Sequence, residues 1–323
     1  MRDPYVIEIT ETGGTDVLKP VTRAPRRPGP GEVLVEQTAI GLNFIDTYYR
    51  TGLYPVKLPF VPGSEGAGRV LEIGEGVVDF QVGDRVAYLG AGTYSTHYTG
   101  PAAMMIKLPD NVSDATGAAV LLKGLTAWML LFAIRRASPG ETALVWAPAG
   151  GVGSLLLPWA TSMGVRCIAV TSNQEKREKA LSLGASEALI FDDQLAAKVR
   201  ELTDGQGVDV SFDSVGKASA EASLNSLRPR GWWISYGNAS GAVDPVAPGI
   251  LGAKGSLVLT RPSLFAFIST AAELRAGAAA LFGALKTKTI QAEIGQEFAL
   301  MDIASAHTAL EAGATIGATI LKP

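Results

Sequence analysis

The pattern of apolar and polar residues changes along the chain and divides it into regions with different predicted structure. In the first third, short alternating runs are separated by Gly, Pro and Asp, which is the pattern of strands joined by turns. Strands are predicted at 4–10, 32–38, 67–73, 85–89, 94–98 and 103–108, with a surface connection at 20–31 and a helical turn or two at 45–50. Many short strands at this spacing are typical of a small barrel or sandwich.

After Ser113 the pattern becomes helical, and from Thr142 apolar strands alternate with helices. The predicted helices are 113–122, 124–137, 151–163, 174–183, 192–203 and 216–227, and the predicted strands are 142–146, 165–170, 187–191, 208–213, 232–236 and 256–260. This alternation predicts a doubly wound parallel sheet with helices on both faces. From Pro262 we expect a long Ala-rich helix to about Leu285, a short strand, a helix at 302–311 and a strand at 316–321, in a tail that returns to the first domain.

The turn after the first of these strands has the composition of a dinucleotide-binding loop. Thr142–Trp146 is followed by Ala147-Pro148-Ala149-Gly150-Gly151-Val152-Gly153 and then by a helix. Gly150 and Gly153 take the second and third glycine positions of the G-x-G-x-x-G pattern, and Pro148 takes the first. Small residues let the backbone approach a pyrophosphate at the helix N-terminus. The alternative is a purely structural glycine turn.

The end of the second strand of this region favours NADPH over NADH. An acidic residue about 20 positions after the glycine turn binds the ribose 2′-hydroxyl in NAD-preferring folds. The corresponding positions here carry Thr171, Ser172 and Asn173, and Lys176 follows on the next helix. Small donors and a cation suit a 2′-phosphate. A solvated helix face is the alternative interpretation of the cation.

Composition excludes several classes of protein. At 323 residues the chain is expected to form about two domains, and its net charge of −3 lacks the basic signature of a nucleic-acid binder. One cysteine and two histidines do not suggest a metal site, because zinc takes three or four Cys, His or carboxylate ligands. Cys167 reads as a small buried hydrophobe. No run of about 18 uninterrupted apolar residues predicts a membrane span, and no apolar signal core stands at the N-terminus, so we expect a cytoplasmic protein.

Several motifs then resemble those of one family. They are 41–55 (GLNFIDTYYRTGLYP), 62–68 (PGSEGAG), 83–86 (GDRV), 123–127 (KGLTA), 149–153 (AGGVG), 213–216 (DSVG), 236–241 (YGNASG) and 260–264 (TRPSL). This set resembles the zeta-crystallin-like NADPH:quinone oxidoreductases, the zinc-free branch of the medium-chain dehydrogenase/reductase superfamily, and is closest to the bacterial members. The resemblance is collinear over nearly the whole chain. Ser64 stands where zinc-dependent relatives have a histidine ligand.

The resemblance implies an α/β fold with two domains and a site between them. Residues 1–122 and 263–323 are expected to form a GroES-like β-barrel catalytic domain, and 123–262 a Rossmann domain that binds NADPH in the cleft. A homodimer joined through the edge of the Rossmann sheet is expected. The resemblance also implies the residues that bind NADPH: Asn43, Phe44, Asp46, Tyr48, Thr126, Gly150, Gly151, Val152, Ser172, Asn173, Lys176, Phe191, Ser214, Val215, Gly237, Asn238, Arg261, Pro262 and Ser263. The chain departs from the family pattern at two positions. Phe191 replaces a tyrosine, which removes a hydroxyl, and Gly313 replaces a frequent arginine, which removes a cation; whether these changes weaken NADPH binding is left open by the sequence.

In the expected reaction the cofactor carries the hydride, so the protein contributes mainly orientation, electrostatics and exclusion of water. Tyr48 and Tyr54 are the candidate proton donors and Asn43 a candidate hydrogen-bond donor to substrate or nicotinamide. In the alternative interpretation Tyr48 packs against the cofactor and Tyr54 shapes the loop. Arg50 is interpreted as structural, and Lys123 as the partner of a carboxylate.

Three functions are compatible with these residues. The first is NADPH-dependent reduction of small quinones, by hydride or single-electron transfer. The second is reduction of activated C=C bonds in enones or enoyl thioesters. The third is a nucleotide-binding protein with a structural or RNA-binding role, against which the acidic composition argues.

Overall fold

The computed structural model describes residues 3–323, which divide into two compact units. The first unit comprises the residues up to Leu125 together with Ile268–Phe282 and Ala292–Pro323. The second comprises Thr126–Phe267 and Gly283–Gln291. The domain boundaries expected from the sequence, at 122/123 and 262/263, concern folding units and stay a prediction.

The first unit is built on a seven-stranded sheet that winds around its longest strand, β3. One edge of β3 pairs with β4 along most of its length. The other edge is shared, since residues 32–36 pair with β6 and residues 40–42 with β15. This sharing coils the sheet into the expected barrel-like form. Its strands are β3 (Glu32–Leu42), β4 (Glu65–Ile73), β5 (Arg85–Leu89), β6 (His97–Pro101), β7 (Met105–Lys107), β14 (Ile294–Ala299) and β15 (Ala318–Lys322).

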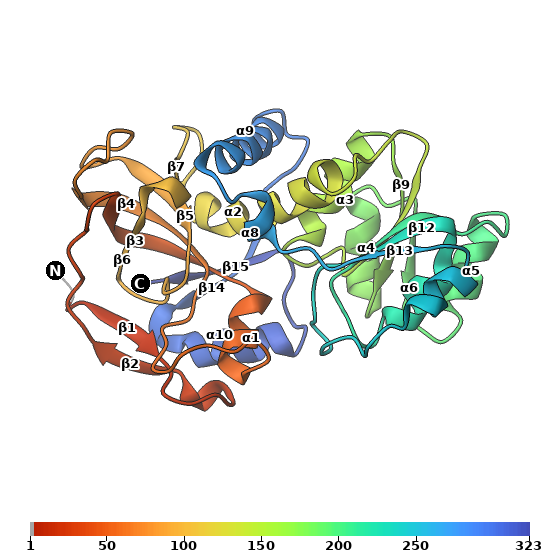
Figure 1. Cartoon of the computed structure of the whole chain (residues 1–323), viewed down its shortest axis with the longest axis horizontal. Coiled ribbons are helices and arrows are strands. Elements are labelled where there is room, and N and C mark those ends of the chain that lie inside the picture. Colours follow the sequence, from red (N-terminus) through yellow and green to blue (C-terminus); the bar gives the residue numbers. More distant parts are fainter. Residues whose placement is uncertain (1–2) are drawn as a thin grey trace. The chain divides into compact units, whose positions relative to one another are not determined.

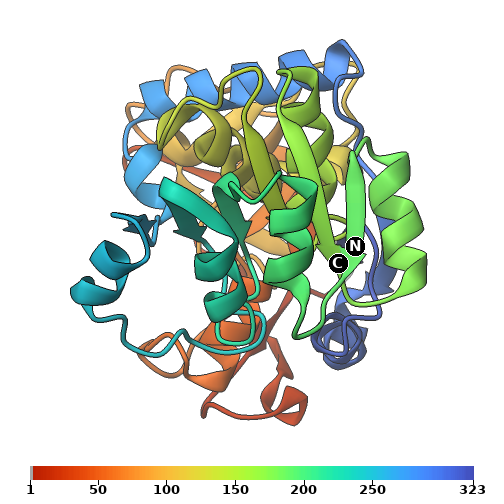
Figure 2. The ribbon, with the colours of Figure 1, turned by 90° about the vertical axis from the view of Figure 1, so that its right-hand side faces the viewer.

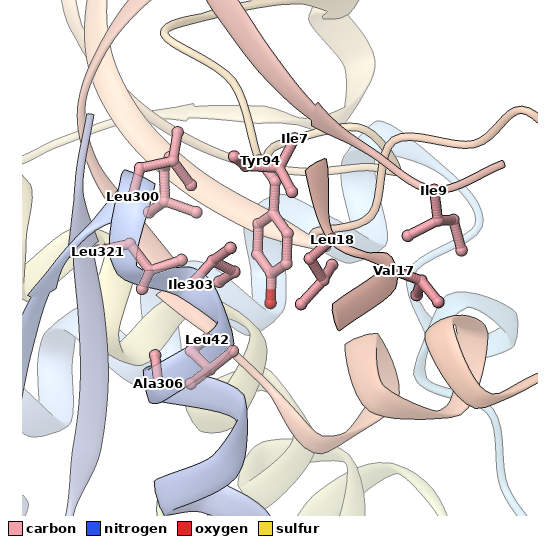
Figure 3. Close-up of a cluster of buried hydrophobic side chains, with 11 residues drawn as sticks. Ile7, Ile9, Val17, Leu18, Leu42, Tyr94, Leu300, Ile303, Ala306 and Leu321 are labelled. Carbon is pink, nitrogen blue, oxygen red and sulfur yellow. The ribbon is translucent and has the colours of Figure 1, made fainter. Parts of the chain in front are cut away.

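A hairpin, short helices and 3₁₀ turns complete the first unit around this sheet (Figure 1). They are the hairpin of β1 (Tyr5–Glu8) and β2 (Lys19–Thr22), the helices α1 (Phe44–Thr51) and α10 (Ile303–Glu311), and the 3₁₀ turns η1 (Thr15–Val17), η2 (Ala102–Met104) and η4 (Leu300–Asp302). Apolar side chains from the hairpin, η1, η4 and α10 pack with others from β3, β15 and the connections between elements in one buried cluster: Ile7, Ile9, Val17, Leu18, Ile40, Leu42, Tyr94, Leu300, Ile303, Ala306 and Leu321. Figure 3 shows the Tyr94 ring in the middle of this cluster. The cluster therefore fixes α10, from the chain's tail, against residues near its beginning.

The second unit contains the predicted parallel sheet, with the strand order β10-β9-β8-β11-β12-β13. Helices cover both of its faces (Figure 2). The strands are β8 (Thr142–Trp146), β9 (Arg166–Thr171), β10 (Glu187–Ile190), β11 (Val208–Asp213), β12 (Leu227–Ser235) and β13 (Val258–Thr260), and the helices between them are α3 (Gly153–Ser162), α4 (Gln174–Ser182), α5 (Leu195–Leu202), α6 (Ala220–Ser226) and α7 (Pro248–Ala253). Chain order reverses between β8 and β11, where ligands of doubly wound folds bind. The fold class expected from the sequence, a GroES-like barrel with a Rossmann sheet, is confirmed.

The two helices expected at 113–122 and 124–137 are one. Helix α2 (Asp114–Trp128) runs on into the π-helical turn η3 (Met129–Ala133). An added Cβ at Gly124 would overlap the side chain of Leu281 on α9 (Ala271–Lys286). Gly124 therefore serves the close packing of two helices and does not end one.

The single long helix expected from Pro262 to Leu285 is wrong. The chain forms the short α8 (Leu264–Phe267) and then α9. At the start of α9, Thr270 Oγ1 accepts from Glu273 N at 3.2 Å and Glu273 Oε2 accepts from Thr270 N at 3.0 Å. This reciprocal capping box starts a new helix inside the Ala-rich run.

Among residues 3–323, one helix is long and apolar enough to span a membrane. It is the 20-residue stretch Asp114–Ala133, and 72% of its most apolar window is buried inside the protein. Core helices commonly have this composition.

Candidate active site

Nearly all the cofactor residues expected in the second unit lie at one edge of its sheet. Parallel strands have their carboxyl ends at the same edge, and each strand is followed directly by expected residues. Gly150, Gly151 and Val152 follow β8, Ser172 and Asn173 follow β9, Phe191 follows β10, Ser214 and Val215 follow β11, Gly237 and Asn238 follow β12, and Arg261, Pro262 and Ser263 follow β13. Thr126 is the exception, because it is buried within α2.

The turn after β8 fits a pyrophosphate. Val152, the N-cap of α3, makes no side-chain capping hydrogen bond. Within the described residues 3–323, no acceptor is paired with the N–H groups of Gly151 and Val152, which start the helix. An added Cβ at Gly153 would overlap Ala147 O, so this glycine is required by the tight turn. The free N–H groups and the helix dipole favour an anion here.

The end of β9 fits a phosphate on the ribose. Asn173 caps α4 by accepting from Lys176 N at 2.9 Å, which places the Asn173 and Lys176 side chains on the same turn. Burial lowers the pKa of the Lys176 ammonium, and the neighbouring Glu175 opposes that shift. A poorly solvated cation gains more from a phosphate partner than a fully hydrated one.

Phe191 lies next to the end of β9, because its backbone N–H donates to Thr171 O at 2.9 Å. Its ring meets that of Trp146 edge-on, with centroids 5.1 Å apart, and 38% of its surface is exposed. It therefore offers an apolar face and no hydroxyl at the position where the family pattern has a tyrosine.

The loop after β11 is held by a buried carboxylate that the sequence analysis did not select. Asp213 is fully buried and accepts hydrogen bonds from backbone N–H groups, hydroxyls and an indole. The donors are Val215 N, Gly216 N, Ser219 Oγ, Ser223 Oγ and Trp233 Nε1. These five donors fix the backbone of Ser214 and Val215 at the sheet edge.

Arg261 ties the ends of the last two strands together. Its Nη1 donates to Ser235 O at 2.9 Å. With the Asn238 amide oriented to satisfy both of its ends, Arg261 Nη2 donates to the Asn238 oxygen at 3.2 Å. The loops after β12 and β13 are therefore one connected group.

In the first unit, helix α1 gathers the residues expected at the nicotinamide and substrate end. Tyr48 is buried, and its ring lies 6.4 Å from that of Phe44 and 5.2 Å from that of Tyr54. Tyr49 extends the group, with its centroid 5.9 Å from that of Tyr54. These rings form an aromatic surface with phenol groups, the kind of surface that suits a flat, polar-edged molecule.

Asn43, at the N-cap of α1, is held from inside the unit. Its Nδ2 donates to Glu65 Oε1 at 3.0 Å and to Gly41 O at 3.3 Å. The same Glu65 oxygen accepts from Lys123 Nζ at 2.6 Å in a buried ion pair, so Lys123 does pair with a carboxylate. Both amide hydrogens of Asn43 are thus used within the unit, and this disfavours Asn43 as a donor to substrate.

Asp46 is fully buried on α1 and accepts from three donors. These are Ser64 Oγ at 2.6 Å, Asn43 N at 2.9 Å and Tyr94 OH at 3.0 Å. Burial raises the pKa of Asp46 to about 6, although the three donors and the Lys123 charge act in the opposite direction. The sequence pointed to Asp46 but not to Tyr94, which lies 48 positions away.

No metal centre is formed by the part of the chain that the structure describes. In residues 3–323, no group of three or more His, Cys, Asp or Glu side chains is placed to hold a metal ion. Cys167 is buried, and burial raises the pKa of its thiol to about 11.

A GroES-like sheet and a doubly wound parallel sheet in one chain define the medium-chain dehydrogenase/reductase class. Residues 29–110 match the family model described as alcohol dehydrogenase GroES-like domain, and residues 151–284 match that described as zinc-binding dehydrogenase.

Comparison with individual proteins identifies the family within this class. A quinone oxidoreductase of Pseudomonas aeruginosa is 46% identical, over 98% of this chain and 99% of the relative. A 2-haloacrylate reductase of a Burkholderia species is 41% identical over 92% of each chain. The crystal structure of an Escherichia coli quinone oxidoreductase complexed with NADPH superimposes with a TM-score of 0.96, at 40% identity, over 99% of this chain and 100% of the other. The chain belongs to the quinone oxidoreductase family.

Proposed function

We propose that the protein is an enzyme that reduces small quinones with NADPH, without a metal. The observation that carries this proposal is that the residues expected to bind the cofactor gather at the carboxyl edge of the parallel sheet. No acid stands directly after β9, and Lys176 follows on α4. Relatives support it, because close ones are named quinone oxidoreductases and one is solved with NADPH.

In this proposal the second unit binds and orients the cofactor. Gly151 and Val152 hold the pyrophosphate with backbone N–H groups, and Ser172, Asn173 and Lys176 surround the 2′-phosphate. The residues after β11, β12 and β13 line the rest of the channel, namely Ser214, Val215, Gly237, Asn238, Arg261, Pro262 and Ser263. When bound, NADPH supplies the hydride or electron that reduces the quinone.

The first unit acts at the reacting end. Phe44 and Tyr48 present aromatic faces, and Asp46 fixes the start of α1 by capping Asn43 N. The reduced quinone oxygens gain protons from Tyr48 or Tyr54, or from solvent. If Tyr48 and Tyr54 only shape the site, the variants Tyr48→Phe and Tyr54→Phe will have the wild-type kcat. If one of them is the proton donor, its replacement will lower kcat by about 10²–10⁴-fold.

The test is steady-state NADPH oxidation with 1,4-benzoquinone and 9,10-phenanthrenequinone, with NADH as a parallel donor. Quinone turnover that prefers NADPH supports the proposal. Tight NADPH binding without turnover of any acceptor would overturn it and leave a binding protein.

Reduction of activated C=C bonds is the second candidate, and the 41% identity to a 2-haloacrylate reductase favours it. This reaction needs a proton donor at the α-carbon, for which Tyr48 and Tyr54 are again the candidates. An alkyl enone, a 2-haloacrylate and crotonyl-CoA in the same assay separate the two reactions, since turnover confined to these acceptors would exclude the quinone proposal.

The assembly and compartment belong to the same proposal: a homodimer in the cytoplasm, joined through the edge of the Rossmann sheet. Strand β13 forms one edge of that sheet, and an edge strand offers unpaired backbone groups to a second copy. Sedimentation of the purified protein measures the mass of the assembly.

A further inference from the structure

A chain of buried side chains joins α1 to α10 inside the first unit. Arg50 Nη1 lies 3.1 Å from His307 Nδ1, His307 Nε2 lies 3.0 Å from Tyr94 OH, and Tyr94 OH lies 3.0 Å from Asp46 Oδ2. His307, Tyr94 and Asp46 are each 0% exposed. Buried polar chains of this kind are expensive unless every member is satisfied.

The chemistry of arginine fixes the direction of every bond in this chain. A guanidinium only donates, so His307 Nδ1 accepts and the imidazole is neutral, with its proton on Nε2. His307 Nε2–H therefore donates to the Tyr94 oxygen, and the Tyr94 hydrogen is left for the Asp46 carboxylate. Burial and the Arg50 charge lower the pKa of His307 to about 3, in agreement with a neutral ring.

The spacing of the charged residues makes this chain a clamp between two helices. Asp46 and Arg50 are four positions apart on α1, and His307 and Glu311 are four positions apart on α10, so each pair lies on one helix face. Arg50 also binds Glu311 with two bonds, of 2.6 and 2.9 Å. Successive turns of the two helices are thus linked twice.

The clamp ends on the residue that fixes the start of α1. Asp46 Oδ2 accepts from Tyr94 OH and from Asn43 N. We propose that Tyr94 and His307 are positioning residues, which hold Asp46 and through it the part of α1 that presents Phe44 and Tyr48 to the reaction. This inference rests on the proposed function for the role of α1.

Other groups near the clamp also enter any pH profile. Lys123 on α2 and Ser64 act on Asp46, and the Asp46 charge acts in turn on Tyr49. Arg50 and Glu65 on β4 act on Tyr94. Removing one donor from a buried carboxylate raises its pKa, because the anion loses a favourable bond.

The first variant is Tyr94→Phe, which removes one hydroxyl and both of its bonds. We expect kcat/KM for the acceptor to fall about tenfold and the acid limb of its pH profile to move up by about one pH unit. Tyr98→Phe is the matched control. Tyr98 is a buried phenol of the same unit, its ring stacked on that of Tyr88, and it is not part of the clamp.

The second comparison replaces His307. Gln offers a donor and an acceptor, like the neutral ring, so His307→Gln should keep at least about half of the wild-type kcat/KM. Phe fills a similar volume but offers neither a donor nor an acceptor, so His307→Phe should lower kcat/KM about tenfold. A purely space-filling role predicts the reverse order. Equal activity of the Gln and Phe variants, or of the Tyr94→Phe and Tyr98→Phe variants, would overturn the proposal.

A titration separates this inference from the proposed function. The Asp46 carboxyl carbon is followed by NMR in wild type and in Tyr94→Phe, and its midpoint should be higher in the variant. An unchanged midpoint would contradict the positioning role of Tyr94, whichever acceptor the protein reduces. A wild type that fails to reduce quinones contradicts the proposed function alone, and the kinetic comparison then uses the acceptor that it does reduce.

Discussion

At the scale of single residues, we propose that Lys176 carries the preference for NADPH. It is the cation nearest in sequence to the end of β9, on the turn capped by Asn173. Lys176→Ala should raise the Kd for NADPH about 10–100-fold, since a charge-assisted hydrogen bond is worth about 1.5–3 kcal/mol, and leave that for NADH unchanged. Fluorescence titration measures both constants.

The control for this variant is Lys198→Ala, because Lys198 forms an exposed ion pair with Asp192 at the surface of the same unit. Equal weakening of NADPH and NADH by Lys176→Ala would show that the side chain supports the loop without reading the phosphate.

His307 should make the protein sensitive to acid. Its pKa is about 3 in the folded chain and near its ordinary value of 6.5 when unfolded. The unfolded chain therefore takes up a proton first, and the free energy of unfolding falls as the pH drops from about 6.5 towards 3, by up to about 1.4 kcal/mol per pH unit. Asp46, whose folded pKa of about 6 lies above its ordinary value of 3.8, acts in the opposite direction, because the folded chain protonates first.

His307→Gln removes the first contribution and keeps the second. Urea unfolding at pH 7 and at pH 4.5 should show that wild type loses about 2–3 kcal/mol more than this variant over that range. Parallel losses in the two proteins would mean that His307 is protonated in the folded state.

The sequence predicted the position of residues well where one short segment contains the whole signal. The glycine turn and Ser172, Asn173 and Lys176 are contiguous with their strands, so motif and place coincide. No local pattern in the sequence indicates the clamp. Arg50 and Glu311 are 261 positions apart, and only the folded first unit shows that they meet.

At the scale of elements, the loop after β11 depends on a buried carboxylate. Ser219 Oγ lies 2.7 and 2.8 Å from the two Asp213 oxygens. Ser219→Ala should lower the free energy of unfolding by about 1–3 kcal/mol, the usual cost of an unsatisfied buried group. It should also speed hydrogen exchange at the Val215 and Gly216 amides, which donate to the same carboxylate.

Ser226→Ala is the matched control, because Ser226 is a buried serine of the same helix region whose hydroxyl donates to Ala222 O. If both variants speed exchange in the Val215–Gly216 loop equally, Asp213 does not organise that loop.

The capping box at Thr270 gives a second prediction at this scale. Thr270→Ala removes the hydroxyl that accepts from Glu273 N, and it should cost about 1 kcal/mol, the usual value of an N-cap. Thermal unfolding measures the loss, and Ser269→Ala, which leaves that cap bond in place, is the comparison. An unchanged melting temperature would mean that packing alone starts α9.

Element prediction succeeded where apolar runs are bounded by clear breakers. The strands at 142–146 and 208–213 were predicted within the observed bounds. β12 was predicted to begin five residues too late, at 232, because Pro229 and Gly231 are residues typical of turns. In the structure the β11–β12 register shifts there, and Arg230 adopts a positive φ of 62°, so the irregularity is absorbed within the strand. Tertiary pairing overrides the local signal.

At the scale of the whole molecule, the doubly wound fold explains why the expected cofactor residues are spread over six loops. One sheet edge collects segments from residue 150 to residue 263, although no two of these loops are adjacent in sequence. Period and length indicate a doubly wound sheet, but they do not state which strand lies beside which. The order β10-β9-β8-β11-β12-β13 follows from the right-handed crossovers of this fold and from pairing between distant strands.

The proposed homodimer predicts that one edge of the Rossmann sheet is protected on association, and the other edge of the same sheet is the control. Its two edges are β13 and β10. If a second copy pairs along β13, the amides of Val258–Thr260 will exchange more slowly as protein concentration rises, because association protects an edge that is otherwise open to water. The amides of Glu187–Ile190 on β10 should show no such dependence. Hydrogen exchange at several protein concentrations, together with the mass measured by sedimentation, tests this dimer. A monomeric mass would contradict it, and so would protection that increases at β10 instead of β13.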